Sequence, residues 1–324
     1  MYINIDTPIS EIQELLIQIG CIDPDKEQLV AIETPGEGNM NVVLRVTTTV
    51  RSFIVKQSRP YVQKYQEIDA PIERIDVEYQ FYKTIVNKEI MSHIPDVLCY
   101  NEANYILVLK DLVQCKDMSY LYEDRSIKKR DFDDLVAISA IIHKAEVTKS
   151  YPENKELRLL NHQHIFVLPF EKENGFDLDA VQDGLQALSL EYKNDEHLKN
   201  IITEVGDRYL SEGDTLIHGD YYPGSWMTKL DHIYVIDPEF SFKGFAEFDL
   251  GVLVAHAVMI TGDKSFLEKT IDQYPATIDK DLVSKVAGIE IMRRLIGLAQ
   301  LPLDRTIDEK TRLLTIAYDF ILVS

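Results

Sequence analysis

The chain has 324 residues, and its 34 Lys and Arg residues against 54 Asp and Glu residues give a formal net charge of −20. So acidic a chain is a poor binder of nucleic acid or of an anionic membrane surface, because both present phosphate groups that attract Lys and Arg. Hydrophobic residues make up 45% of the chain and charged residues 27%, as in folded globular proteins. The length suits two domains, or one unit with two lobes.

The N-terminus and the cysteines favour a cytoplasmic protein. Residues 1–20 are acidic and lack the basic start and the apolar run of a signal peptide. No apolar run is long enough to predict a membrane-spanning helix. Cys21, Cys99 and Cys115 are scattered and lack CxxC spacing, so they indicate neither a disulfide framework nor a zinc site. The oligomeric state stays open, with a homodimer among the alternatives.

In the front part of the chain, the spacing of apolar residues predicts one helix followed mainly by strands. Helical spacing predicts a helix over residues 9–19, which Gly20 would end. A long polar loop follows Lys56, and a second helix is predicted over residues 72–88. The predicted strands are rich in β-branched or other apolar residues and cover 29–33, 42–49, 52–57 and 105–109.

From residue 131 onward the pattern changes to helical periodicity, interrupted by one β-rich island at residues 214–240. The predicted helices of this part cover 131–145, 196–210, 248–260, 279–300 and 307–322. We therefore predict an α+β fold of two lobes, with a β-rich N-lobe over residues 1–112 and a mainly helical C-lobe over residues 113–324. A cleft between the lobes is the expected site.

The island carries the chemistry, in the segment TLIHGDYYPGSWMTKLDHIYVIDPEFSFKGFAEFDL. His218-Gly219-Asp220 follows one short strand, and Asp237-Pro238-Glu239 follows a predicted hairpin. Carboxylates at the ends of buried strands are costly unless they meet a metal, a cation or a transferable proton. A cluster of Asp220, Asp237 and Glu239 would suit Mg²⁺, with substrate phosphates completing its ligand shell.

The order HGDxxPGS, IDPE and FDL resembles the aminoglycoside phosphotransferase superfamily. The resemblance implies a bilobal, protein-kinase-like fold and transfer of phosphate from ATP, with Mg²⁺, to a hydroxyl of a small molecule. It is greatest to the methylthioribose kinases, which have a similar HGD…GS segment and DPE in place of the kinase DFG. The similarity covers most of the chain, from about residue 36 to residue 300.

The resemblance assigns roles to the residues of the island. Asp220 would orient the attacking hydroxyl and accept its proton. Asp237 would be the principal Mg²⁺ ligand, Glu239 a second, and Ser225 a third in the place where most relatives have Asn. Two residues outside the metal site would shape the loop: His218 would orient it, and Asp249 would brace it by accepting hydrogen bonds.

In the front part the resemblance implies a nucleotide site. A turn between two strands would cover the phosphates, because glycines let backbone N–H groups approach phosphate oxygens. This turn consists of Gly36, Glu37, Gly38 and Asn39. Lys56 would pair with the nucleotide phosphates, and Glu78 would hold that lysine. Lys110 and Leu112 fall at the hinge, where backbone groups would bind adenine.

The sequence identifies the residues that would bind the acceptor less clearly than those that would bind the nucleotide. Arg293 and Arg294 interrupt an apolar helix, and methylthioribose kinases have a similar pair near the sugar. Neighbouring residues on a helix point about 100° apart, so we expect only one of the two to face the cleft. Tyr221 and Tyr222 flank the catalytic turn and are candidate acceptor contacts. Because the loop around Trp226 departs from the methylthioribose kinases, an aminoglycoside, an amino alcohol or another sugar stays open as the acceptor.

Two other classes are weighed against this one. A non-catalytic, nucleotide-binding kinase-fold protein is opposed by Asp220, Asp237 and Lys56 and favoured only by Ser225. A protein kinase is disfavoured because the motif is HGD rather than HRD, with no evident activation segment before Asp249.

Three further features need an interpretation. His143 lies on an apolar helix face and is interpreted as a core or bracing histidine. The run Asn161-His162-Gln163-His164 has two histidines and no nearby cysteine, and we interpret it as a polar loop rather than a metal site. Residues 41–66 hold five basic residues and no Asp or Glu, so the acidic chain has a positive stretch where the phosphates are expected.

Overall fold

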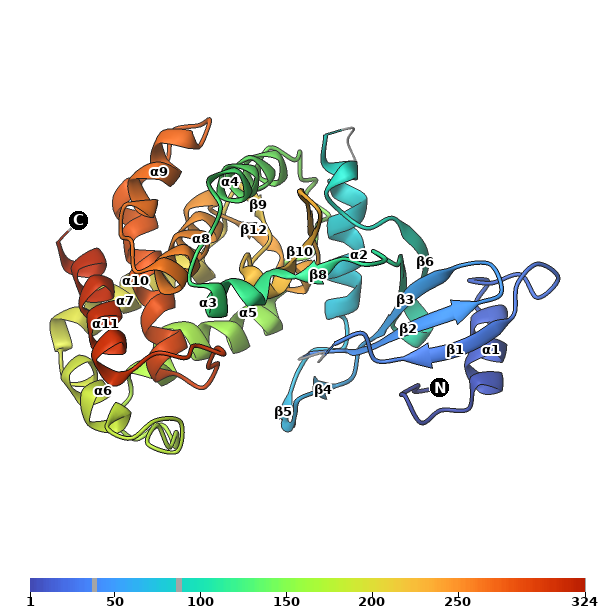
Figure 1. Ribbon diagram of the computed structural model, residues 1–324, viewed down its shortest axis with the longest axis horizontal. Coiled ribbons are helices and arrows are strands. Elements are labelled where there is room, and N and C mark those ends of the chain that lie inside the picture. Colours follow the sequence, from blue (N-terminus) through green and yellow to red (C-terminus); the bar gives the residue numbers. More distant parts are fainter. Residues whose placement is uncertain (37–39, 86–88, 324) are drawn as a thin grey trace.

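The structure, a computed structural model, describes residues 1–36, 40–85 and 89–323. Within these ranges a β-rich N-terminal part is followed by a mainly helical part, and the C-terminus lies at the far end from the N-terminal sheet (Figure 1). The predicted α+β class, with a β-rich front and a helical back, is confirmed. In the same ranges, no helix combines the length and the apolar character that crossing a bilayer requires.

The N-terminal part is built on an antiparallel sheet in the order β1-β2-β3-β7-β6. Its strands are β1 (Leu29–Glu33), β2 (Val42–Thr48), β3 (Ser52–Gln57), β6 (Val97–Asn101) and β7 (Ile106–Lys110). Buried and half-buried residues alternate along β2, as expected of a strand with one face on a core. That core is shared with helix α1 (Ile9–Gln18), whose Ile12, Leu15 and Leu16 are buried.

The two faces of the sheet pack against different helices, because successive side chains of a strand point to opposite faces. Along β7, Ile106 and Val108 belong to the core with α1, whereas Leu107 and Leu109 belong to a central core with α2 (Arg74–Thr84). Figure 1 shows α2 standing between the sheet and the helical part. The central core continues into the helical part through Trp226 and Leu253, so the two parts share buried apolar side chains.

The helical part surrounds two small sheets. Its helices are α3 (Leu121–Asp124), α4 (Lys129–His143), α5 (Lys155–His162), α6 (Leu185–Lys193), α7 (Glu196–Leu210), α8 (Ala246–Thr261), α9 (Phe266–Gln273), α10 (Lys280–Ile296) and α11 (Ile307–Leu322). The sheets contain β8 (Lys116–Asp117), β9 (Thr215–Ile217), β10 (Trp226–Lys229), β11 (His232–Val235) and β12 (Phe242–Gly244), paired as β11-β10-β8 and β12-β9. Helix α10 packs against both α8 and α11 and is buried along most of its length.

The elements differ from the predicted ones in a few places. The polar loop predicted after Lys56 contains a hairpin of β4 (Tyr61–Val62) and β5 (Tyr65–Asp69), and β6 was not expected. The prediction also missed α5, α6 and α9, which are short. Helix α10 ends at Ile296, before the predicted end at residue 300. The predicted helix 72–88 corresponds to α2, and its last three residues lie outside the described ranges.

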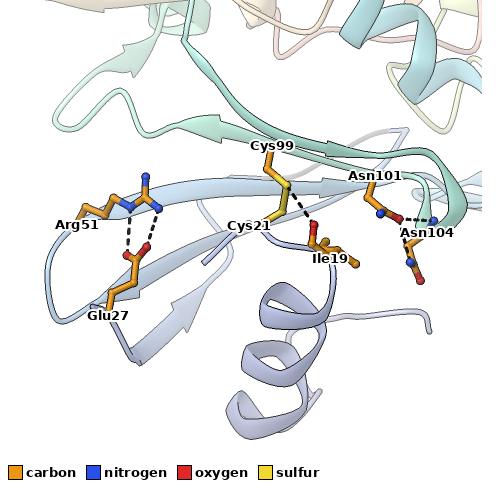
Figure 2. Close-up of a disulfide and its surroundings, with 7 residues drawn as sticks. All are labelled: Ile19, Cys21, Glu27, Arg51, Cys99, Asn101 and Asn104. Carbon is orange, nitrogen blue, oxygen red and sulfur yellow. Dashed lines mark hydrogen bonds and ion pairs between the residues drawn. A yellow bond between two sulfur atoms is a disulfide. The ribbon is translucent and has the colours of Figure 1, made fainter. Parts of the chain in front are cut away.

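The cysteine pattern was misleading for one pair. Cys21 and Cys99 form a disulfide that joins the segment after α1 to β6, with their Cα atoms 5.4 Å apart (Figure 2). The two residues are 78 positions apart in the chain, so their spacing carries no sign of the pairing. The sheet brings them together, and Cys115 stays free.

Candidate active site

Residues from both parts of the molecule line one cavity of about 1410 Å³. It gathers eleven of the predicted site residues: Gly36, Lys56, Lys110, Leu112, Asp220, Tyr222, Ser225, Asp237, Glu239, Arg293 and Arg294. Two predicted residues do not line the cavity. Glu78 is buried and accepts a hydrogen bond from Lys56, and Tyr221 is buried next to Asp220 in the HGD loop. Gly38 and Asn39 lie outside the residues that the structure describes.

Lys56 sits at the centre of an ion cluster on the wall formed by the sheet. It pairs with Leu107 across β3 and β7 and therefore faces the α2 side of the sheet. Its Nζ donates to both carboxylate oxygens of Glu78 on α2, at 2.8 and 2.6 Å, and to Asp237 Oδ1 at 2.8 Å. The alternation of the strand thus brings the predicted lysine and its predicted acid together.

The charges of this cluster control its protonation. Burial by itself would lower the pKa of Lys56, but the carboxylates of Asp237, Glu78 and Glu239 raise it, so the lysine stays charged. Burial raises the pKa of Glu78, and the charge of Lys56 opposes this. Arg74 is the second cation at this wall, so three carboxylates meet two cations.

Asp237 is exposed to the cavity on a strained backbone. Its φ of 62° lies in the left-handed region, directly before Pro238, and 45% of its side chain is exposed. Asp tolerates this region better than most residues, and such strain is concentrated at functional sites. Glu239, two residues on, is held differently: it accepts a hydrogen bond from Asn41 at 2.9 Å and lies 3.4 Å from Arg74 Nε.

The loop that carries Asp220 is braced from below. The backbone N–H groups of His218 and Gly219 donate to the carboxylate of Asp249, at 2.6 and 2.9 Å. His218 Nε2 donates to the carbonyl of Ile236 at 2.9 Å, and its Nδ1 accepts from the backbone N–H of Asp220 at 3.3 Å. The sequence predicted these bracing roles for His218 and Asp249.

A third group completes the brace. His143 Nε2 lies 3.1 Å from Asp249 Oδ2, and its Nδ1 lies 2.9 Å from the hydroxyl of Tyr274. The bracing role predicted for His143 is therefore confirmed.

Gly219 is required by the shape of this loop. Its φ is +83°, and a Cβ there would lie 2.3 Å from the carbonyl oxygen of Phe240. Any other residue would meet both the backbone strain and the clash. The glycine lets the HGD loop pass directly over the segment that follows Asp237.

Both arginines of the pair reach Asp220, which corrects the expectation that only one would face the cavity. Asp220 Oδ1 lies 3.4 Å from Arg294 Nη2 and 3.8 Å from Arg293 Nη2. The reason is Glu290, one turn earlier on α10, whose two carboxylate oxygens each bind the Nε of one arginine. Glu290 is three positions before Arg293 and four before Arg294, so it shares a helix face with both. The two long arginine side chains therefore converge on its carboxylate.

Glu290 is held in turn by groups that the sequence did not single out. His256 Nε2 lies 3.0 Å from Glu290 Oε1, and its Nδ1 lies 2.6 Å from the hydroxyl of Tyr122. All three side chains are almost fully buried. The only signal in the sequence is an acid one turn before two arginines in an apolar helix, and nothing local identifies His256 on α8 as its partner.

The charges of this network set several pKa values. Burial raises the pKa of Asp220, and the charges of Arg294 and Arg293 oppose this. Burial alone would also raise the pKa of Glu290, but the two arginines lower it well below its ordinary value. Burial lowers the pKa of His256 to about 4, so this imidazole is neutral at neutral pH.

The two tyrosines of the loop divide into one that packs and one that faces the cavity. Tyr221 is fully buried, donates to the carbonyl of Leu135 at 2.8 Å and packs edge-on against Trp226. Its position gives no support to a contact with the acceptor. Tyr222 lines the cavity, and the guanidinium of Arg294 lies 4.8 Å from the centre of its ring.

The predicted hinge also borders the cavity. Lys110 and Leu112 line it, and the ammonium of Lys110 points to the exposed Asp96 at 2.9 Å. Between them, the buried Asp111 accepts from Arg45 Nε at 2.9 Å and from Ser52 Oγ at 2.6 Å. These contacts fix the end of β7, so the backbone of the hinge is held at the cavity edge.

Known proteins resemble this chain in sequence. The profile of the phosphotransferase enzyme family, APH, matches residues 31–281. A methylthioribose kinase of Geobacillus sp. (strain WCH70) is 26% identical over 330 residues, which cover 86% of this chain and 81% of that relative.

Solved structures resemble the fold along nearly its whole length. A choline kinase of Streptococcus pneumoniae has a TM-score of 0.55 at 12% identity and covers 97% of this chain and 99% of its own. A spectinomycin phosphotransferase in complex with ADP and spectinomycin has a TM-score of 0.54 at 14% identity, with coverage of 97% and 99%. At such low identity these likenesses show the fold, which is the expected kinase-like one.

Proposed function

The chain belongs to the phosphotransferase enzyme family and is a small-molecule kinase, and on that premise we propose that it transfers the γ-phosphoryl group of ATP to a hydroxyl of a sugar, methylthioribose first among the candidates. The observation that carries the proposal is that one cavity joins the Lys56 cluster to Asp220 and its two arginines. Such enzymes act mainly by positioning and by charge neutralisation.

The wall formed by the sheet would bind the nucleotide. Lys56 would pair with phosphate oxygens, Gly36 and its turn, with Gly38 and Asn39, would cover them, and the hinge backbone at Lys110 and Leu112 would bind adenine. Support comes from the charged lysine held by Glu78 and from the position of Gly36 and the hinge at the cavity. The proposed lobe boundary, at residue 112, falls just after the hinge.

We propose that a divalent cation binds beside Lys56, held by two carboxylates and one hydroxyl. The expected cluster of three acids that includes Asp220 is not formed, because the described residues contain no group of three acidic, His or Cys side chains suited to a metal ion. The cavity-facing carboxylate of Asp237, the hydroxyl of Ser225 and the carboxylate of Glu239 line the same cavity. Hard oxygen ligands of this kind suit Mg²⁺. When bound, Mg²⁺ would neutralise charge on the phosphates.

Asp220 would orient the acceptor hydroxyl and take its proton. Burial raises the pKa of this carboxyl, which favours proton acceptance, and the arginines hold it in place. The same arginines favour a sugar over an aminoglycoside or an amino alcohol, because a cationic acceptor would enter beside two guanidinium groups. Tyr222, stacked on Arg294, would shape the acceptor end.

The test is ATP turnover with a panel of acceptors: methylthioribose, other pentoses, an aminoglycoside and an amino alcohol. We expect a sugar to stimulate ADP release, and Asp220→Asn to lower kcat by about 100-fold or more. If no acceptor raises turnover above that of Asp220→Asn, the chain is a nucleotide-binding protein without this activity. If only amines do so, the sugar assignment is wrong.

We further propose a cytoplasmic location and a homodimer. The Cys21–Cys99 disulfide argues against that location, because thiols are normally kept reduced in the cytoplasm. Free thiols at both positions in protein isolated under alkylating conditions would support the location. Light scattering reads the oligomeric state directly, and a monomer mass would exclude the dimer.

A further inference from the structure

The segment Asn161-His162-Gln163-His164 is not the polar loop that the sequence predicted. Helix α5 runs to His162 and continues into a turn of π-helix at Gln163–Val167. Turns of π-helix insert one extra residue into a helix and occur frequently at functional sites. The proposed nucleotide site uses no residue of this turn, so the turn has no function assigned to it yet.

The turn divides its polar residues between two sides. His162 and Phe166 pack against α7, where a Cβ on Gly206 would lie 2.8 Å from His162 Nε2 and 3.1 Å from Phe166 Cβ. Asn161 and His164 instead line the active-site cavity. The close packing on Gly206 anchors one side of the turn and fixes which side chains the other side presents.

His164 lies near Arg293 of the arginine pair, whose charge acts on its ring, and Asn161 lines the same cavity from the last turn of α5. The π-helical turn packs against α10, which carries Arg293, and Arg293 lies 3.8 Å from Asp220. Asn161 Nδ2 donates to the hydroxyl of the buried Tyr209 at 3.1 Å, which fixes the orientation of the amide. Burial, and then the charge of Arg293, lower the pKa of His164, so its ring is neutral at neutral pH.

We propose that Asn161 and His164 form a hydroxyl-binding subsite for the acceptor, and that this subsite selects an uncharged, polyhydroxylated molecule such as a sugar. The inference rests on the proposed function and deepens it. It names residues that would bind the ring hydroxyls that do not react, next to the hydroxyl that Asp220 would orient.

The chemistry of the two side chains matches adjacent hydroxyls. A neutral imidazole offers one N–H donor and one acceptor nitrogen, and the amide of Asn161, tied to Tyr209 through its nitrogen, offers its carbonyl oxygen. A hydroxyl both donates and accepts, so neighbouring ring hydroxyls satisfy both partners. An ammonium group could bind the amide oxygen, but it would enter a cavity that two guanidinium groups, those of Arg293 and Arg294, also line.

The experiment compares His164→Phe and Asn161→Leu with the wild-type enzyme, using the sugar that the acceptor panel identifies, with methylthioribose tried first. We expect the acceptor KM to rise about 10-fold or more, since each variant removes a hydrogen bond to the sugar. The KM for ATP should not change, and kcat should stay within about threefold. Gln163→Ala, at an exposed neighbour on the same turn that does not line the cavity, is the matched control.

Two further measurements keep the proposal testable if a variant folds poorly. His164→Gln keeps a donor and an acceptor and should restore most of the acceptor affinity. With the wild-type enzyme, an analogue lacking one unreactive ring hydroxyl should show a KM about 10-fold higher, and His164→Phe or Asn161→Leu should lose that discrimination.

The outcomes separate the two proposals. If the wild-type enzyme phosphorylates a sugar but the variants keep its KM and its discrimination against the analogues, the subsite is wrong and the proposed function stands. If the wild-type enzyme phosphorylates only amines, or nothing, both proposals fall.

Discussion

At the scale of single residues, Lys56 is the residue on which the proposed nucleotide site depends. Its side chain is 4% exposed, and it bonds to one acid on α2 and another after β11. It therefore ties the sheet to the helical part, and it also lines the cavity. Replacing Lys56 should therefore affect activity far more than replacing a lysine on the surface.

We predict that Lys56→Met lowers kcat/KM for ATP by about 100-fold or more, because a preorganised charge at the phosphates is lost. Lys129→Met removes a lysine whose side chain is 82% exposed and should leave kcat/KM unchanged. Initial rates at varied ATP concentration provide the measurement. A loss of less than about threefold in Lys56→Met would remove this lysine from the nucleotide site.

The second prediction concerns Gly219, and Gly262 serves as the control that separates backbone strain from the clash with Phe240. Gly219 and Gly262 both have positive φ, +83° and +76°, but a Cβ would meet Phe240 only at Gly219 and nothing within 4 Å at Gly262. We expect Gly262→Ala to cost about 1–2 kcal/mol of unfolding free energy, and Gly219→Ala about 3 kcal/mol or more. Denaturant unfolding measures both. Equal losses would show that the contact with Phe240 relaxes without cost.

At the scale of elements, α8 and α10 are joined by a buried chain of polar side chains that ends at Asp220. Tyr122 contacts His256, His256 contacts Glu290, and Glu290 holds both arginines. The chain shows how two neighbouring residues on one helix come to face the same cavity. It also makes the packing of α8 against α10 sensitive to pH.

The pH dependence follows from the lowered pKa of His256. The pKa of His256 is 6.5 in the unfolded chain and about 4 in the folded protein. Between these two values His256 is protonated in the unfolded chain but neutral in the folded protein, so a falling pH favours unfolding. Stability is therefore full above pH 6.5 and falls as pH drops toward 4, by about 3 kcal/mol for this group. His256→Gln should remove that part of the slope. Urea unfolding of both proteins between pH 4 and 8 tests it, and parallel curves would contradict it.

At the scale of the whole molecule, the disulfide ties α1 to the far edge of the sheet. Figure 2 shows Cys21 and Cys99 joined near the turn that carries Asn101 and Asn104, with the Glu27–Arg51 ion pair at the opposite end of the same region. The loop that it closes is long, so the unfolded chain loses much of its freedom when the bond forms.

We predict that the double replacement Cys21→Ala and Cys99→Ala lowers the free energy of unfolding by about 2–4 kcal/mol relative to the oxidised protein. Cys115→Ala, which removes the free cysteine, should change it far less. Unfolding with and without dithiothreitol provides the comparison. A wild-type protein that is insensitive to reductant would show that the bond adds nothing to stability.

Much of the fold and of the site could be predicted from local patterns. The resemblance to the kinase fold implied that Glu78 holds Lys56, and the position of the HGD and DPE segments after neighbouring short strands predicted that Asp220 and Asp237 reach one site. The structure brings Lys56 to Glu78 and places both aspartates at one cavity. Both segments lie directly after short strands, so chain connectivity limits where their side chains lie. Short helices such as α6 and α9 were missed, because they span too few turns for a clear period.

The sequence by itself determined the α+β class, the phosphotransferase family and the residues that we propose for the chemistry, because these depend on periodicity and on motifs within a few tens of residues. Only the tertiary structure decided that both arginines reach Asp220, that His256 stands behind Glu290, that Cys21 meets Cys99, and that Asn161 and His164 face the cavity. These contacts join residues from separate elements, and which side chains meet there is set by how helices and strands pack rather than by spacing along the chain.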